Sequence, residues 1–244
     1  MAGLEDDRIG KAPEGGSGAV PLPVESRRHF RLDEESKYLS DSVPIKPQRL
    51  MHELPRLFPP NTYYLADSGA SLSWAIHYLH PYDRRMAGQR DGKGGLFHAV
   101  TEFASMGWAI GSAVGSALAR PGDPVVCIVG DGSMLMSGQE ITVAIQEKLP
   151  VIFVVLNDSA LGMVKHGQRM TGAEAIGTAL PVVNFAAFAR AMGANGHVIE
   201  SPADVLALDG KAIATHPGPT LLDVRIDADE SPPIGFRTSF LKPV

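Results

Sequence analysis

The sequence predicts a three-layer α/β/α domain built on a mostly parallel sheet. Two apolar runs, 125–129 and 151–156, are rich in β-branched residues and too short for helices, which indicates buried strands. Residues 139–148 between them have the pattern of a helix. The resulting β-α-β unit brings the carboxyl ends of both strands to one edge of the sheet, and this edge is where ligands bind in such folds.

The other elements follow from the same patterns. We expect a strand at 62–66, a helix at 72–79 and a helix that runs from the cap residue Asn184 to Met192. A helix at 47–54 should stop near Pro55, because proline removes a backbone donor. We expect two further strands, at 197–199 and at 221–226.

Composition divides the chain and limits its functions. Residues 1–42 are rich in Gly, Pro and charge and predict a flexible arm, 43–230 a globular domain and 231–244 a tail. A net charge of −5 without a basic stripe argues against nucleic acid as a partner. The single cysteine, Cys127, excludes a disulfide within the chain and fits a cytoplasmic protein, and no segment is long and apolar enough to suggest a membrane span.

Polar clusters follow both central strands. Gly130-Asp131-Gly132-Ser133 follows the first strand, and Asn157-Asp158 follows the second. Asp131 and Asn157 offer the oxygen ligands that Mg²⁺ shares with phosphates, while Gly132 and Ser133 would let backbone N–H groups approach an anion. A tight turn with Asp131 as a helix cap is the structural alternative.

These residues carry a family resemblance. Gly-Asp-Gly followed after 24 residues by Asn resembles the thiamine diphosphate (ThDP) motif, and residues 130–168 resemble the C-terminal domain of the acetolactate synthase, pyruvate oxidase and benzoylformate decarboxylase family. The resemblance covers about 43–227. It implies that Mg²⁺ is held by the side chains of Asp131 and Asn157 and the backbone carbonyl of Ser159. It also implies diphosphate contacts from Gly69, Ala70, Ser71, Gly132, Ser133, Ala160, Leu161 and Gly162.

A third segment has a counterpart in the family. The resemblance makes Met106 an apolar wedge under the cofactor, which bends it into a V shape. The backbone of Ala104 would accept a hydrogen bond from the aminopyrimidine, and Ser105 lies between the two in the predicted site. Met106 as ordinary core filling is the alternative interpretation.

The family needs a second domain. Its activating glutamate lies on a pyrimidine-binding domain that this chain is too short to contain. The resemblance therefore implies one subunit of a split enzyme, in a heterotetramer with a partner that supplies this domain, and a reaction of decarboxylation or carboligation on a 2-oxo acid. Two other classes stay open: a non-catalytic ThDP-binding or regulatory subunit, and a binding module for another phosphorylated ligand.

Three residues are candidates for the substrate pocket. His98 and His166 flank the predicted cofactor site. Acetolactate synthases have the segment Met-Val-Arg-Gln-Trp-Gln where this chain has Gly167 in place of the tryptophan. We therefore expect a larger or differently closed acceptor pocket.

Overall fold

A parallel sheet organises the molecule, whose computed structural model describes residues 35–79 and 96–234. Within these ranges the sheet has six strands in the order β2-β1-β3-β4-β6-β5, and every neighbouring pair is parallel. The strands are β1 (Tyr63–Ala66), β2 (Phe97–Ala99), β3 (Val125–Gly130), β4 (Val151–Asn157), β5 (Asn195–Ile199) and β6 (Thr220–Arg225).

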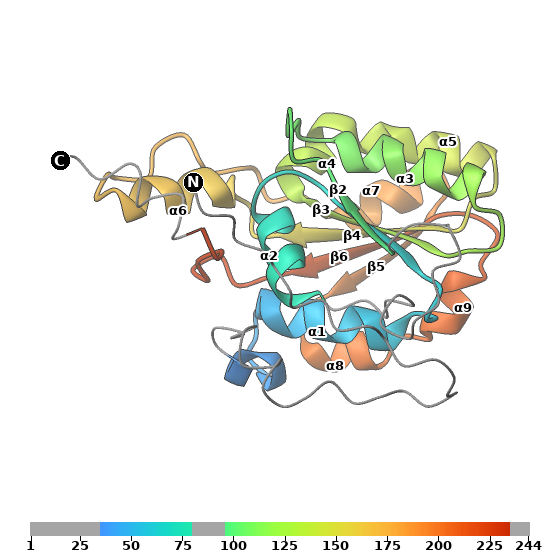
Figure 1. Ribbon diagram of the computed structural model, residues 1–244, viewed down its shortest axis with the longest axis horizontal. Helices are drawn as coiled ribbons and strands as arrows, with labels where there is room; N and C mark the ends of the chain where they lie inside the picture. Colours follow the sequence, from blue (N-terminus) through green and yellow to red (C-terminus); the bar gives the residue numbers. More distant parts are fainter. Residues whose placement is uncertain (1–34, 80–95, 235–244) are drawn as a thin grey trace, which may run out of the picture.

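Helices cover both faces of the sheet (Figure 1). One face carries α1 (Pro47–Leu57), α2 (Ala70–Tyr78), α8 (Pro202–Leu206) and α9 (Gly210–Ala214). The other carries α3 (Trp108–Ala119), α4 (Asp131–Ser137), η4 (Gly138–Glu140), α5 (Ile141–Gln146) and α7 (Phe185–Met192). In contrast to these helices, α6 (Gly162–Met170) projects beyond the carboxyl ends of the strands (Figure 1). The predicted three-layer fold is confirmed.

The two central strands are buried on both faces, as their unbroken apolar runs predict. In β3, Val126 and Ile128 pack in the cluster under α1 and α2, while Cys127 and Val129 pack in the cluster under α3 and α5. All four side chains are fully inaccessible to solvent. Two separate cores therefore hold the sheet from either side.

The helix predicted to stop near Pro55 continues to Leu57, so that prediction is wrong. The backbone N–H of Phe58 donates to the carbonyl of Leu54 at 3.2 Å, which shows that the last turn is intact. Pro55 removes only one hydrogen bond, and a helix tolerates this loss close to its end.

The helix predicted at 139–148 is also wrong in its bounds. A first helix, α4, begins at Asp131 itself, and the helical path is then interrupted at Gly138 by the short η4 before α5. A side chain at Gly138 would come within 3.2 Å of both Met134 Cε and Phe188 Cε1, so close packing selects glycine there.

Packed structure extends beyond the predicted limits of the domain. Tyr38 lies in the short helix η2 (Glu35–Leu39) and is only 5% exposed, and Ile234 is buried at the other end. Residues 1–34 of the predicted arm and 235–244 of the predicted tail lie outside the described residues.

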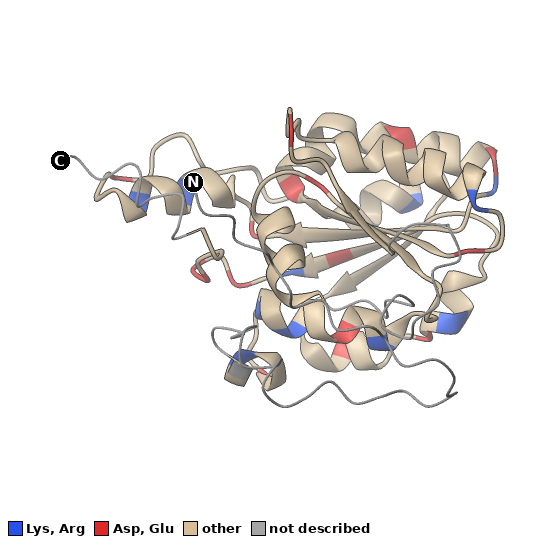
Figure 2. Ribbon diagram, in the orientation of Figure 1, with Lys and Arg blue, Asp and Glu red and all other residues tan. Residues whose placement is uncertain are grey.

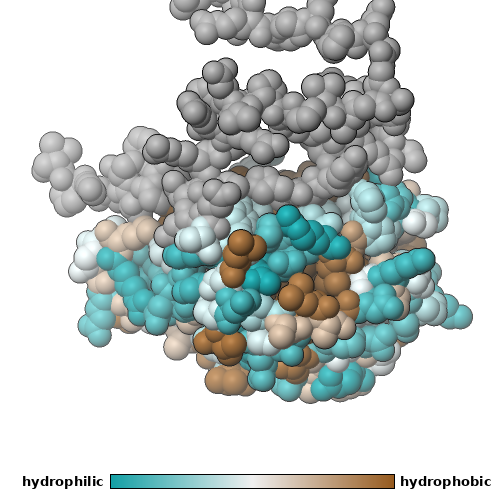
Figure 3. Space-filling model, turned by 90° about the horizontal axis from the view of Figure 1, so that it is seen from below, coloured by the Kyte–Doolittle hydropathy of each residue, from teal (hydrophilic) through white to brown (hydrophobic). Residues whose placement is uncertain are grey.

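The face formed by α1 and α8 has apolar patches separated by polar ones (Figure 3). A hollow between these helices is lined in part by Leu57, Leu206 and Leu208. In the two described ranges, no helix combines the length and the apolar character that crossing a bilayer requires.

Candidate functional site

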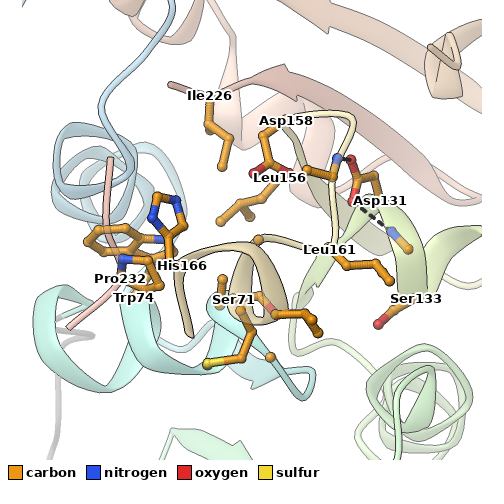
Figure 4. A pocket seen from close by; sticks show the side chains of 18 of the residues that line it. Ser71, Trp74, Asp131, Ser133, Leu156, Asp158, Leu161, His166, Ile226 and Pro232 are labelled. Atoms are coloured by element: carbon orange, nitrogen blue, oxygen red, sulfur yellow. Dashed lines mark hydrogen bonds between the residues drawn. The ribbon is translucent and has the colours of Figure 1, made fainter. Parts of the chain in front are cut away.

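A pocket lies at the carboxyl edge of the sheet, where the strand order reverses. From β1 the sheet extends to β2 on one side and to β3 on the other, and such a switch point is where open α/β sheets bind ligands. The walls come from the segments that follow β1, β3, β4 and β6, together with the start of α6. Figure 4 shows Asp131 and Ser133 at one end of the pocket and Trp74, His166 and Pro232 at the other.

Strand register brings the two predicted metal ligands to the same level. Gly130 is paired with Leu156 across β3 and β4, so the next residues, Asp131 and Asn157, stand at adjacent strand ends. Both side chains are buried, at 4% and 3% exposure. The structure thus juxtaposes the two polar clusters that the sequence separates by 24 residues.

Asp131 is a buried carboxylate that is held by backbone N–H groups. Its Oδ1 accepts from Gly132 at 2.7 Å and its Oδ2 from Ala160 at 3.2 Å (Figure 4). Burial raises the pKa of Asp131 to about 6, although these backbone hydrogen bonds oppose the shift. Within 35–79 and 96–234 it forms no ion pair with a basic side chain. A divalent cation would supply the missing positive charge.

Asn157 has its amide nitrogen fixed. Nδ2 donates to the carbonyl of Val183 at 3.1 Å and to Asp223 Oδ1 at 2.8 Å, which uses both of its hydrogens. The amide oxygen is therefore the atom available to a metal. Asn157 itself is not part of the pocket wall.

Two residues with a predicted role for the backbone carbonyl lie in an uncommon conformation: Ala104 as acceptor for the aminopyrimidine and Ser159 as a ligand of Mg²⁺. Ala104 and Ser159 have φ of 52° and 53°, in the left-handed region that non-glycine residues rarely adopt. The Ser159 carbonyl also accepts from the N–H of Leu180 at 2.8 Å. Such local strain concentrates at functional sites, which fits the predicted use of both carbonyls.

Met106 reaches the segment that follows β3. A Cβ built on Gly132 would lie 3.2 Å from Met106 Cε and 2.8 Å from Leu161 Cδ2, so both side chains lie over Gly132. Met106 lines the pocket and is 38% exposed, which makes it more than ordinary core filling. The predicted cofactor residues that line the pocket are Gly69, Ala70, Ser71, Met106, Asp131, Gly132, Ser133, Ala160, Leu161 and Gly162.

The three predicted substrate residues lie in different places. His166 lines the pocket and is 5% exposed; its Nε2 donates to the carbonyl of Ala228 at 3.2 Å, and burial lowers its pKa. His98 lies outside the pocket wall on β2, with its ring 5.0 Å from that of Tyr63. Gly167 is also outside the pocket wall, and no atom lies within 4 Å of the position that a Cβ would take there.

Sequence reasoning missed Asp67, which holds the Met106 loop. This carboxylate is fully buried directly after β1, and its two oxygens accept from the N–H groups of Gly107 at 2.8 Å and Ala109 at 2.9 Å. It therefore anchors the start of α3 to the end of β1. Its position directly after a predicted strand was the only available signal.

Asp158 was also missed as a site residue. It lines the pocket, and burial raises its pKa to about 7, with a further contribution from the nearby charge of Asp131. No cluster of three or more His, Cys, Asp or Glu side chains that could hold a metal occurs in the part of the chain that the structure describes. A cation here would thus need backbone, amide or ligand oxygens as well, which is usual for Mg²⁺.

Ion pairs fix the far wall of the pocket. Lys46 Nζ lies 2.6 Å from Asp227 Oδ2 and 2.8 Å from Glu230 Oε2, while Lys165 Nζ donates to the carbonyl of Ala228 at 2.8 Å. Figure 2 shows acidic residues in this segment after β6 and basic residues on α1 and α6 beside it. The segment consequently ties α6 to the body of the domain.

Comparison with known proteins agrees with this geometry. The family described as "Thiamine pyrophosphate enzyme, C-terminal TPP binding domain" matches residues 67–224, which is more than half of the chain. The chain belongs to the thiamine pyrophosphate enzyme family. Thiamine pyrophosphate is ThDP, so this match agrees with the predicted resemblance.

The relatives of this chain are longer. IlvB2 of Mycobacterium tuberculosis is 37% identical over 197 residues, which covers 79% of this chain and 33% of the relative. The acetolactate synthase isozyme 3 large subunit of Escherichia coli is 32% identical over 205 residues, covering 82% and 34%. The structure of benzoylformate decarboxylase from Polynucleobacter necessarius shares the fold, with a TM-score of 0.67 at 23% identity, covering 78% and 35%. The chain spans about a third of the length of these relatives.

The pocket carboxylates predict an unusual dependence of stability on pH. The raised pKa of Asp158 means that its contribution to stability is complete below the unfolded value of 3.8 and is lost as pH rises through about 7. Without divalent cations, Asp158→Asn should therefore raise the melting temperature at pH 8, by roughly 2–4 °C per kcal/mol gained, and little at pH 4. Thermal unfolding in EDTA measures this difference.

Asp204→Asn is the control. Asp204 caps α8 far from the pocket, and its pKa is lowered by the backbone hydrogen bonds from Glu200 and Ser201, so this variant should lose stability at pH 8. A wild-type chain that is more stable than Asp158→Asn at pH 8 would show that the pocket does not strain the carboxylate.

Proposed function

We propose that this chain is the ThDP- and Mg²⁺-binding subunit of an acetolactate synthase-like enzyme that decarboxylates or ligates a 2-oxo acid. The observation that carries the proposal is the position of Asp131 and Asn157 directly after the paired residues Gly130 and Leu156. The Asp131 carboxylate is buried there and lacks a basic partner among the described residues. Family membership and the acetolactate synthase relatives support it.

The donor set fits the proposed group. Mg²⁺ would take one oxygen each from Asp131, Asn157 and the Ser159 backbone, and the diphosphate would complete its coordination. Gly132 packs directly against the side chains of Leu161 and Met106, and all three residues line the pocket, so they would form one wall of the cofactor site. Bound ThDP would supply the electron sink for 2-oxo acid chemistry. The chain itself anchors and orients the cofactor and shields it from water.

A partner would complete the site. Large apolar side chains stay exposed on the segments next to the pocket: Phe103 at 91%, Leu135 at 46% and Met136 at 59%. Exposed apolar groups beside a ligand site favour a covering protein surface. We propose that a separate subunit covers them, in a heterotetramer, and supplies the pyrimidine-binding domain and its glutamate. Purified chain without this domain should bind cofactor but not turn over substrate.

Cofactor binding tests the proposal directly. Isothermal titration of the chain with ThDP should show binding only when Mg²⁺ is present, and Asp131→Ala should abolish it because the metal loses its charged ligand. Circular dichroism of each variant controls for folding. Equal ThDP affinity in EDTA and in Mg²⁺ would contradict the proposal and favour a module for another phosphorylated ligand.

The close packing at Gly132 gives a second test. Gly132→Ala should weaken ThDP binding about tenfold or more, since the added methyl group would lie 2.8 Å from Leu161 Cδ2 and 3.2 Å from Met106 Cε and would displace both side chains from the pocket wall. Gly111→Ala is a matched control on α3, where the new methyl has no neighbour within 4 Å and should slightly stabilise the helix. Equal ThDP affinities for the two variants would exclude a diphosphate at Gly132.

The open space at Gly167 predicts a specificity effect. In the assembled enzyme, Gly167→Trp should reduce activity with a bulky aryl or branched acceptor more than with pyruvate, because no atom lies within 4 Å of the added Cβ and the indole would occupy that space. Steady-state kinetics with paired acceptors measures the ratio. An equal loss on both acceptors would argue against a pocket enlarged at this position.

A further inference from the structure

Asp223 is a fully buried carboxylate in the middle of β6 to which the proposed function gives no role. Its Oδ1 accepts from Asn157 Nδ2 at 2.8 Å, and its Oδ2 accepts from the N–H of Phe185 at 2.9 Å and from Arg225 Nη2 at 3.0 Å. A buried charge is costly unless it is fully hydrogen-bonded. Its neighbours Leu222 and Val224 are apolar core residues, so an acidic residue here needs a specific reason.

The hydrogen bonds of Asp223 decide which way the Asn157 amide faces. An amide can turn by half a rotation with almost no change in shape, which exchanges its oxygen and its nitrogen. Asp223 Oδ1 and the carbonyl of Val183 both accept and cannot donate, so they select the orientation with nitrogen toward them. In that orientation the amide oxygen is available to a cation.

We propose that Asp223 is a positioning residue, which fixes the oxygen of Asn157 toward a divalent cation bound beside Asp131. The proposal rests on the proposed function. It extends the site to a strand, β6, that supplies none of the predicted ligands. Groups that orient a metal ligand through a hydrogen bond usually change metal affinity 10–100-fold when replaced.

The isosteric variant Asp223→Asn should remove the constraint on the Asn157 amide. Phe185 and Arg225 both donate, so they would hold the oxygen of the newly introduced amide and turn its nitrogen toward Asn157. Asn157 would then face that nitrogen either with its own nitrogen or, after turning, with its oxygen, which would also meet the carbonyl of Val183. Each arrangement contains one unfavourable contact, so the amide oxygen is no longer held toward the metal position. We expect 10–100-fold weaker metal binding. Electron paramagnetic resonance of free Mn²⁺ measures it in the full chain with ThDP present.

A double variant that exchanges the residues at 157 and 223 should restore Mn²⁺ binding. In the double variant Asn157→Asp/Asp223→Asn, the amide introduced on β6 donates to the carboxylate introduced on β4, while the amide oxygen still accepts from Phe185 and Arg225. The second oxygen of that carboxylate then faces the metal, and, among the described residues, the only hydrogen bond lost at this position is the one that Asn157 donates to the carbonyl of Val183. Mn²⁺ affinity should recover at least tenfold over Asp223→Asn. The Mn²⁺ affinity of the double variant should also exceed the affinity of Asn157→Asp alone, because in that single variant two buried carboxylates would oppose each other. This second comparison holds even if Asp223→Asn folds poorly.

Asn184→Ala controls for simple loosening of α7. The Asn184 side chain accepts from the N–H of Ala187 at 2.8 Å and caps the same helix end that Asp223 contacts through Phe185. We expect a lower melting temperature for this variant with unchanged Mn²⁺ affinity.

Three outcomes would overturn the positioning role. These are wild-type Mn²⁺ affinity in Asp223→Asn, a double variant no better than Asn157→Asp, or an equal loss of affinity in Asn184→Ala. A wild-type chain that binds neither Mn²⁺ nor ThDP would overturn the proposed function itself, and the positioning role with it.

Discussion

The parallel pairing of β3 with β4 is the constraint on which the rest of the structure depends. Its register sets Gly130 opposite Leu156, and the two predicted metal ligands, Asp131 and Asn157, are the next residues of the two chain segments. A shift of one residue would move one cluster up the sheet and turn its side chains to the other face. Continuous apolar burial on both faces fixes this register, because every side chain of β3 from Val125 to Val129 is inaccessible to solvent.

Burial also gives the carboxyl groups of the site unusual pKa values. The same core that sets the register removes Asp131 and Asp158 from water, and both pKa values rise as a result. Two neighbouring acidic groups at the mouth of an apolar sheet are unfavourable unless they are protonated or neutralised by a cation. The fold therefore accepts a local cost in stability at this edge of the sheet and creates a site that favours positive charge. Under the proposed function, a metal ion bound there would hold the diphosphate of ThDP.

Sequence reasoning predicted the parts of this arrangement that local pattern decides. β-branched runs indicated β3 and β4, and the side chain of Asn184 caps α7 as its position suggested. Pattern failed where packing decides. Pro55 lies too close to the end of α1 to stop the helix there, and the break at Gly138 lies where the chain packs against Met134 and Phe188.

The buried carboxylates were harder to predict for the same reason. Asp67 bonds residues 40 and 42 positions away, and Asp223 bonds Asn157 across 66 positions. In the sequence both look like ordinary polar residues at or within a strand. Their roles as anchors follow only from the folded sheet, which brings the ends of β1, β4 and β6 together with the loops that they hold.

The most direct test is a crystal structure of the chain with ThDP and Mg²⁺. The account predicts one metal ion bonded to Asp131 Oδ, Asn157 Oδ1 and the Ser159 carbonyl, at about the 2.0–2.1 Å that Mg²⁺ requires. A metal held between Asp131 and Asp158, with no bond to the Asn157 amide oxygen, would contradict it.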